Sequence, residues 1–302
     1  MNIISRIKKT HWLPFIIQTV IPFFIPFVFE IPDELMAMSI KLIIIVIVAG
    51  LDLLFIYAIN ITEKEDEKIS FHNQAARCAY SNIYQLNEIK RDYYINSPFL
   101  ENDLPQNIFP YKAKDYIKQI SNSFSNVIAE ITQIEKEHIS VSFIYHFIDT
   151  NEWKWATQKD GTMTLSLDTF IKKRNTLFYQ LINPDEFGRL KTVIFYNDKE
   201  KTAQEGNYYL STRDNRHDNI GSILGIKMAF STNEKILVEG ILTISTYGRK
   251  FVNSSDENKI KTFQKLLIDD LFPNYQRMLE TEMGVLYHEK KLELTLNALN
   301  KA

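Results

Sequence analysis

Glycine and cysteine are scarce in this chain. Its 302 residues include nine glycines and one cysteine, Cys78. The Walker spacing and the dinucleotide fingerprint, in which glycines bring backbone N–H groups close to phosphates, are both absent. A single cysteine is typical of a chain that faces a reducing compartment, because proteins in oxidising surroundings more often carry cysteines in pairs. The sequence therefore does not favour a phosphate-loop enzyme, and it is consistent with a cytoplasmic location for the folded part.

Strong net charge and clustered metal ligands are also lacking. The chain has 35 basic and 37 acidic residues, for a formal net charge of -2, whereas nucleic-acid binding calls for a clustered basic face. Its six histidines show no paired ligand spacing, and no Ser/His/Asp arrangement is recognisable. We therefore expect no catalytic activity, metal site, cofactor or nucleic-acid partner.

Long apolar runs, by contrast, dominate the first sixty residues. Residues 12–29 carry no formal charge, and residues 42–59 carry one, Asp52. Each run is close to the roughly 20 residues that a helix needs to cross the hydrocarbon of a bilayer. No small-residue cleavage site follows the first run, which disfavours a removed secretion signal. The sequence predicts a retained transmembrane hairpin over residues 1–61.

The charges that flank the two runs predict the orientation of this hairpin. Basic residues precede the first run and follow the second, and the turn between the runs is mainly acidic, with Lys41 as its only basic residue. The flanking basic residues are Arg6, Lys8, Lys9, Lys64, Lys68 and Arg77, and the acidic turn residues are Glu30, Asp33 and Glu34. Because basic residues near the spans stay on the cytoplasmic side, we expect a multi-pass protein of the plasma membrane. Its N-terminus and C-terminal domain would both be cytoplasmic.

Three residues of the hairpin are candidates for a role in membrane function or oligomerisation. Pro22 and Pro26 punctuate the first run and favour kinks, which membrane helices tolerate when neighbouring groups satisfy the freed carbonyls. Asp52 would cost about 2.5–3.5 kcal/mol on insertion scales if it lay unpartnered at the bilayer centre. Asp52 either lines an oligomeric interface or a wet path, or lies near enough to the cytoplasmic surface to be hydrated.

Residues 62–96 predict a juxtamembrane signalling or coiled-coil helix. Two registers repeat every seven residues: Ile69, Ala76, Ile83 and Lys90, and, three residues later, His72, Ala79, Leu86 and Tyr93. Small and polar residues in several of these positions make the seam weak, so the helix either pairs with a second subunit or packs onto its own domain. Prolines at 98, 105 and 110 then predict a linker over residues 97–111.

Residues 112–285 have the pattern of an α+β domain with a central antiparallel sheet flanked by helices, followed by a charged tail over 286–302. Apolar residues recur at helical spacing in some segments and alternate in others. Ser254 and Glu257 form an expected capping box for the last helix, which Pro273 should kink or divide. Expected helices are 116–134, 168–181 and 254–286; expected strands are 139–147, 153–157, 192–196, 224–230 and 236–244; a polar excursion covers 199–219.

This order of elements resembles a GAF domain. The closest likeness is in residues 221–228 (Gly-Ser-Ile-Leu-Gly-Ile-Lys-Met) and 238–244 (Val-Glu-Gly-Ile-Leu-Thr-Ile), with Phe251 and Asp256 before the last helix. It extends over about 112–285 by element order, but only over about 220–272 by residue pattern. The resemblance implies a regulatory domain whose sheet and variable loops enclose a small-molecule pocket, often beside dimerising helices. The family's nucleotide-contacting, bilin-attaching and haem signatures are absent, so no ligand class carries over.

Six residues are candidates for ligand binding. Arg213, Arg216 and His217 lie in one loop and could hold a phosphate or carboxylate through charge-assisted bonds, or could belong to a solvated loop with local salt bridges. Trp153 and Trp155 face the same side of their strand and could stack on a planar ligand, although large aromatic residues at this spacing are also typical of a core. Tyr179, in the helix before the loop, is open to the same two interpretations.

Three functions fit these features. The first is a membrane-anchored cytoplasmic sensor that binds a small ligand, such as a nucleotide or metabolite, or a partner, and signals through its membrane helices as a homo-oligomer. The second is a ligand-activated membrane-disrupting effector, similar in outline to those of bacterial nucleotide-signalled antiphage systems. The third is a non-catalytic membrane scaffold.

Overall fold

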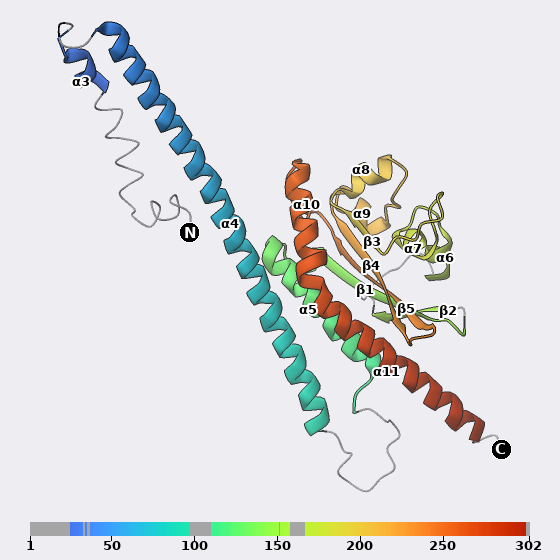
Figure 1. Ribbon diagram of the computed structural model, residues 1–302. Coiled ribbons are helices and arrows are strands. Elements are labelled where there is room, and N and C mark those ends of the chain that lie inside the picture. Colours follow the sequence, from blue (N-terminus) through green and yellow to red (C-terminus); the bar gives the residue numbers. More distant parts are fainter. Residues whose placement is uncertain are drawn as a thin grey trace. The chain divides into compact units, whose positions relative to one another are not determined.

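The structure is a computed structural model that describes residues 25–32, 34, 37–96, 110–150, 152–157 and 167–299. The chain forms two compact units, Met1–Asn73 and Gln74–Ala302 (Figure 1). Pro22, most of the first expected membrane span and residues 97–109 of the expected linker lie outside the described residues.

The first unit contains α3 (Ile25–Glu30) and the beginning of α4 (Met38–Ile95). Pro26 lies in α3 and is exposed. Asp52 lies in α4, where its side chain is outside the described part of the chain. Several large apolar side chains in the part of α4 before Gln74 are more than half exposed, among them Ile43, Val46 and Leu53. Within the described residues, none of the helices combines the length and the apolar character required to cross a bilayer.

A single helix covers the second expected span and the expected juxtamembrane helix. The charged run of residues 62–68 does not interrupt α4, which continues for 58 residues. The physical reason lies in the composition of this run, which is rich in Glu and Lys and has no proline or glycine, so that nothing in it breaks a helix. The C-terminal part of α4, from Gln74, belongs to the second unit.

A five-stranded antiparallel sheet forms the centre of the second unit, with the order β2-β1-β5-β4-β3. Its strands are β1 (Ile139–Phe147), β2 (Glu152–Thr157), β3 (Val193–Tyr196), β4 (Ile223–Ser231) and β5 (Ile236–Thr246). Central β5 pairs with β1 from Ile139↔Thr246 to Phe147↔Val238, and with β4 on its other side. The prediction of an α+β domain with a central antiparallel sheet flanked by helices is confirmed.

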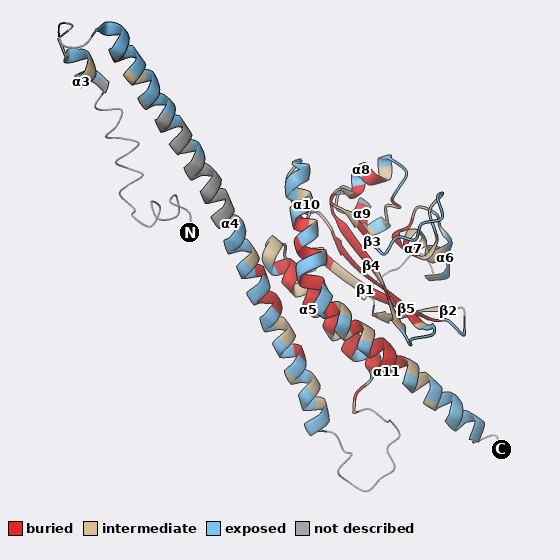
Figure 2. Cartoon of the chain, viewed as in Figure 1, coloured by how far each residue is buried: buried red, intermediate tan, exposed pale blue. Residues whose placement is uncertain are grey.

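Long helices cover one face of this sheet. Helices α5 (Ala113–Thr132) and α11 (Phe272–Leu299), with the C-terminal part of α4, share one apolar core with the sheet (Figure 2). Helix α11 lies very close to the strands: a Cβ atom added to Gly240 of β5 would come within 2.6 Å of the Phe143 ring and 3.0 Å of Met283 Sδ. Glycine is required there because a side chain would separate helix from sheet. We call this side the helical face.

Short helices cover the other side, which we call the loop face. They are α6 (Leu167–Lys172), α7 (Leu177–Ile182), α8 (Lys199–Gln204) and α9 (Thr212–Asn215). A smaller apolar core lies beneath them, with Ile144 and Ile241 of the sheet and Leu181 of α7 fully buried. Leu177 packs directly over Gly225, where any side chain would overlap it.

The expected helix 168–181 is two helices, so this prediction is wrong in detail. The single proton of the Thr176 hydroxyl is shared between the carbonyls of Phe170 (2.5 Å) and Lys173 (2.8 Å). The hydroxyl oxygen also accepts a hydrogen bond from the N–H of Tyr179, as the N-cap of α7. A threonine that satisfies backbone groups in this way competes with a continuous helix. The sequence pattern of apolar residues alone does not register that competition.

The last helix begins and continues differently from the prediction. Asp256, not Ser254, is the N-cap of α10 (Glu257–Lys265), so the expected capping box is wrong. A π-helical segment, η3 (Leu266–Leu271), precedes α11. Pro273 cannot donate a backbone hydrogen bond, and the wider turn before it accommodates the proline without ending the helix. The expected charged tail belongs to α11 as far as Leu299.

Candidate functional site

A fully buried ion pair lies at one end of the loop face. Lys199 at the start of α8 and Asp214 in α9 are 0% and 1% exposed, and Nζ lies 2.7 Å from Oδ1. The ammonium also donates to Ser245 Oγ at 2.6 Å and to the Thr246 carbonyl at 2.8 Å. All three ammonium donors are therefore satisfied, as a buried cation requires.

The environment of this pair changes the titration of Lys199. Burial lowers the pKa of the Lys199 ammonium to about 8, because desolvation outweighs the attraction of Asp214. Asp214 in turn accepts from the N–H and hydroxyl of Ser211, at 2.8 and 2.6 Å, in a capping box at the start of α9. The pair thus joins α8, α9 and the end of β5 at a single point. Because the Lys199 side chain has no access to solvent, we assign it a structural role.

Tyr247, directly after β5, connects this buried pair to the surface. Its ring centroid lies 4.0 Å from Lys199 Nζ and 4.1 Å from Arg213 Cζ, both within cation–π range. Burial raises the pKa of Tyr247 above its ordinary value. Arg213 Nη2 also donates to the Glu137 carbonyl at 3.2 Å. The segment that contains the predicted Arg213 is thereby attached to Tyr247, directly after β5, and to Glu137, shortly before β1.

The other two candidates of that segment are nearer to solvent. The partly exposed His217 ring lies 5.9 Å from Tyr247 and 5.8 Å from His138. Arg216 is exposed, and among the described residues no ion pair involves it. Arg213, which lies in α9, therefore gathers with His217 and Tyr247 at one place, and Arg216 follows directly after α9. We call residues 211–219, which include α9, the arginine loop. The loop is not simply solvated, since Asp214 anchors it in the interior.

A second polar group lies at the opposite end of the loop face. His146 of β1 stacks on Trp153 of β2, with centroids 5.1 Å apart and planes 21° apart. Glu239 of β5 pairs with Lys227 of β4 at 2.8 Å and lies 3.8 Å from His146 Nδ1, beyond hydrogen-bond distance. Desolvation lowers the pKa of His146, which favours the neutral ring. Trp153 therefore already has a stacking partner within the protein.

The six predicted ligand-binding residues do not form one pocket. Trp155 makes an edge contact with Phe178 of α7, with ring centroids 6.0 Å apart. The partly exposed Tyr179 follows Phe178 in that helix. Trp153 aligns through His146 with Glu239 of β5, whereas the arginine loop meets the strand at Tyr247. At about 3.3 Å per residue, eight residues of strand separate the two groups by about 25 Å.

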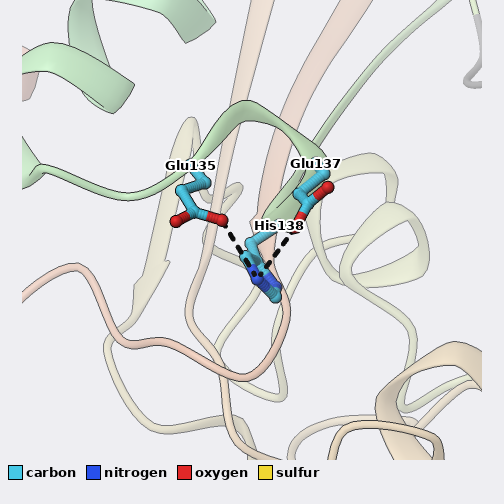
Figure 3. A group of neighbouring side chains, drawn as sticks. All are labelled: Glu135, Glu137 and His138. Atoms are coloured by element: carbon cyan, nitrogen blue, oxygen red, sulfur yellow. Dashed lines mark ion pairs between the residues drawn. The ribbon is translucent and has the colours of Figure 1, made fainter.

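One group of side chains has ligand atoms close enough for a metal ion. Glu135, Glu137 and His138 lie around the short 3-10 helix η2 (Lys136–His138), with His138 Nε2 3.9 and 3.7 Å from the two carboxylates (Figure 3). Both glutamates are about three-quarters exposed. His138 Nδ1 is buried without a hydrogen-bond partner in the described part of the chain, whereas metal-bound histidines nearly always donate from the second nitrogen. We assign no metal to this group.

A cavity of about 600 Å³ lies elsewhere in this unit, beside the start of α5 and the distal half of α11. Phe147, Leu286 and Leu292 line it with apolar surface, and Lys112 and Lys154 are among its basic residues. It contains none of the six predicted ligand-binding residues. The sequence predicted neither this cavity, which lies between segments far apart in the chain, nor the Lys199–Asp214 pair, whose burial depends on Ser245 and Thr246, 46 and 47 residues beyond Lys199.

Comparison of the chain with protein-family models, with curated proteins and with solved structures gives no match.

Proposed function

We propose that this chain is a non-catalytic cytoplasmic sensor anchored in the plasma membrane, in which a GAF-like domain binds a small ligand and signals through the membrane-proximal helix. It acts as a homo-oligomer, with its N-terminus and folded domain on the cytoplasmic side. The ligand is a nucleotide or metabolite that carries an anionic group. Signal output passes through the anchor or an associated protein.

The observation that carries this proposal is the continuity of α4. One helix runs from Met38 to Ile95, with exposed apolar side chains in its first part and buried contacts to the sheet domain in its last part. Exposed apolar surface of this extent calls for a partner, and lipid is the partner that fits two apolar runs flanked by basic residues. Because this helix belongs to both the anchor and the domain, it can transmit a signal between them.

The sheet supports the GAF-like part of the proposal. Its strands run antiparallel, with long helices on one face and short helices and loops on the other, as the resemblance implies for a domain that holds its ligand beneath variable loops. The loop face also carries two ion pairs, the buried Lys199 with Asp214 and the partly buried Lys227 with Glu239.

Within the loop face, the arginine loop is the better candidate for the anionic group. Arg213 and Arg216 supply planar donors suited to phosphate or carboxylate, and His217 lies next to them. The buried Asp214 between the two arginines fixes the loop backbone, which limits the entropy lost on binding. At the other end of the loop face, Trp153 is stacked on His146 and Lys227 is paired with Glu239. The ring nitrogens of His146 have no hydrogen-bond partner among the described residues, but desolvation lowers the pKa of this ring, so it offers no positive charge to an anion.

The test uses the full-length chain in lipid nanodiscs. We expect some member of a panel of nucleotides and carboxylate metabolites to raise the melting temperature, and we expect Arg216→Met to abolish this shift without changing the melting of the free protein. Arg174→Met is the matched control, because Arg174 is exposed in the segment between α6 and α7. The panel producing no shift, or a shift that survives Arg216→Met, would contradict the assignment.

Membrane anchoring has a separate test. The full-length chain should sediment with membranes and require detergent for release, and protease added outside intact cells should leave residues 110–299 uncut. Recovery in the soluble fraction without detergent would refute the anchor, whatever the ligand panel shows.

A further inference from the structure

Helix α4 buries mainly small side chains against the sheet domain. Its buried apolar residues there are Ala75, Cys78, Ala79 and Leu86, of which only Leu86 is large, and the larger Ile83 and Tyr93 pack against the core partly buried. Helix α11 buries five larger ones in the same core: Phe272, Tyr275, Leu279, Met283 and Leu286. Since the hydrophobic contribution grows with the apolar area buried, α4 is held less strongly by packing than α11.

Polar contacts supply much of the remaining attachment of α4. The Tyr116 hydroxyl of α5 donates to the Leu86 carbonyl at 2.8 Å, and Cys78 Sγ donates to Glu130 Oε2 at 2.9 Å. Gln119 donates to the Tyr93 hydroxyl at 2.8 Å. Water can replace contacts of this kind when two helices separate, so they are reversible in a way that a large apolar interface is not.

The strongest of these contacts is an ion pair between Lys90 of α4 and Glu282 of α11. Lys90 Nζ lies 2.6 Å from Glu282 Oε1, and the two side chains are 28% and 1% exposed. The Tyr111 hydroxyl donates to the same carboxylate at 3.0 Å. Lys90 also lies 5.2 Å from the ring centroid of Tyr116. A buried carboxylate is costly without a cation, so Glu282 depends on α4 remaining docked.

Glu282 is directly linked to the sheet. The next two residues of α11 are Met283, packed against Gly240 of β5, and Gly284, where an added Cβ would lie 2.8 Å from the Phe230 ring of β4. These close contacts pack α11 directly against the two strands, with no space between them. A shift of β4 or β5 therefore moves Glu282 relative to Lys90.

We infer that the Lys90–Glu282 pair is a releasable clasp that holds α4 against the domain and opens when the sheet displaces α11. This inference rests on the proposed function, since it names the contact by which that sensor would be regulated. Closed, the clasp restrains α4; open, Lys90 regains water through its partly exposed end and α4 separates. The domain keeps its α5–α11 layer in both states, because its core is largely independent of α4.

The native Cys78 can be used to detect opening of the clasp, because its thiol becomes accessible to a labelling reagent only when α4 separates from the domain. Cys78 is the only cysteine of the chain, is 6% exposed between α4 and α5, and has its pKa raised to about 12 by burial and by Glu130. Maleimide labelling of the full-length chain in nanodiscs should therefore be slow. Lys90→Met should accelerate it tenfold or more, Glu282→Gln should accelerate it as well, and Lys90→Arg should restore slow labelling. Arg91→Met is the matched control, since the Arg91 side chain is 66% exposed, and it should leave the rate unchanged.

Hydrogen exchange makes the outcome decisive. In the unmodified chain, amides of residues 75–93 should exchange faster than those of α5 and the domain-packed part of α11. Lys90→Met should increase exchange in α4 alone. The clasp is overturned if Cys78 of the Lys90→Met variant reacts with maleimide at the original rate. It is also overturned if the amides of α5 and α11 lose protection from exchange together with those of α4, because the pair would then stabilise the whole domain. Neither measurement uses a ligand, so failure of the ligand panel and failure of the clasp are distinguishable.

Discussion

The two faces of the sheet are built on different physical principles. The helical face is an apolar core in which Phe124, Tyr275 and Leu279 are completely buried beneath long helices. The loop face has a smaller apolar core under helices of four to six residues and buries the Lys199–Asp214 pair. Buried apolar area holds most of the helical face, apart from the polar contacts of α4, whereas the loop face depends on a smaller core and a few polar contacts of defined geometry. The loop face is therefore the side on which a bound molecule could rearrange the structure at low cost.

The largest effect should come from leaving one charge of the buried pair alone. Asp214→Ala should destabilise the protein by about 3–5 kcal/mol, because Lys199 would stay buried without a counter-ion. The double variant Lys199→Met/Asp214→Asn should lose much less, since no charge remains. Denaturant unfolding measures both, with the exposed Glu200→Ala as control. Equal losses for the single and double variants would show that packing, and not pairing, holds this end of the loop face.

Next in size are large-to-small substitutions on the two faces. Leu177→Ala on the loop face and Leu279→Ala on the helical face each remove a buried leucine and should cost about 2–5 kcal/mol. We expect Leu177→Ala at the lower end, because short helices can collapse into the space above Gly225. Unfolding midpoints at matched denaturant slopes measure the difference. A larger loss at Leu177 would contradict the view that the loop face adapts.

A pH effect of about 3 kcal/mol in total should distinguish the faces as well. The pKa of Lys199 is about 8 in the folded protein, below the ordinary value of about 10.4 in the unfolded chain. Between these values the unfolded state binds more protons, so stability should rise with pH. Stability of the unmodified chain, measured from pH 7.5 to 9.5 relative to Lys199→Met/Asp214→Asn, should increase. The difference from the double variant cancels the ionisation of tyrosines, whose ordinary pKa is about 10, because both proteins contain the same tyrosines. A flat or falling difference would show that Lys199 is not desolvated as described.

The smallest effect concerns the cap of α9. Ser211→Ala removes the hydroxyl that accepts from the Asp214 N–H and donates to its carboxylate, and should cost about 1 kcal/mol. Thr232→Ala in the β4–β5 turn is a suitable control, because its hydroxyl also accepts from nearby backbone N–H groups, but at an exposed site. If Ser211→Ala lowers the free energy of unfolding by several kcal/mol more than Thr232→Ala does, Ser211 also supports the ion pair.

Much of the fold could be predicted because its signals are local. The alternation of apolar residues in β1, β4 and β5 and the helical spacing in α5 are properties of short segments, and these elements are present. The break at Thr176 was missed because a single hydroxyl decides it. The packing partner of the C-terminal part of α4 stayed open, because its weak seam suits a second subunit as well as its own domain. In the structure, Ala79 and Leu86 of the second register are buried in the core of the sheet domain, and Ile83 of the first register packs against that core partly buried.

The candidate site was harder to predict because it depends on strand register. The alternation of side chains along a strand correctly predicted that Trp153 and Trp155 lie on one side of β2. That Trp153 would meet His146, and that Arg213 would lie about 25 Å away at the far end of β5, follows from pairings between segments distant in sequence. Lys199 and Asp214 lay in a polar stretch with no local indication of burial. The local sequence around a charged residue in such a stretch does not indicate which residue it pairs with.

The π-helical turn at Leu266–Leu271 has a consequence for the length of the chain. Large apolar residues repeat every fourth position from Phe263 through Leu267, Leu271, Tyr275 and Leu279 to Met283, which would wind progressively around an α-helix of 3.6 residues per turn. The wider turn absorbs part of that drift. Removing one residue from it would rotate everything downstream by about 100° about the helix axis. This stretch should therefore accept changes of residue type far more readily than a change in the number of residues.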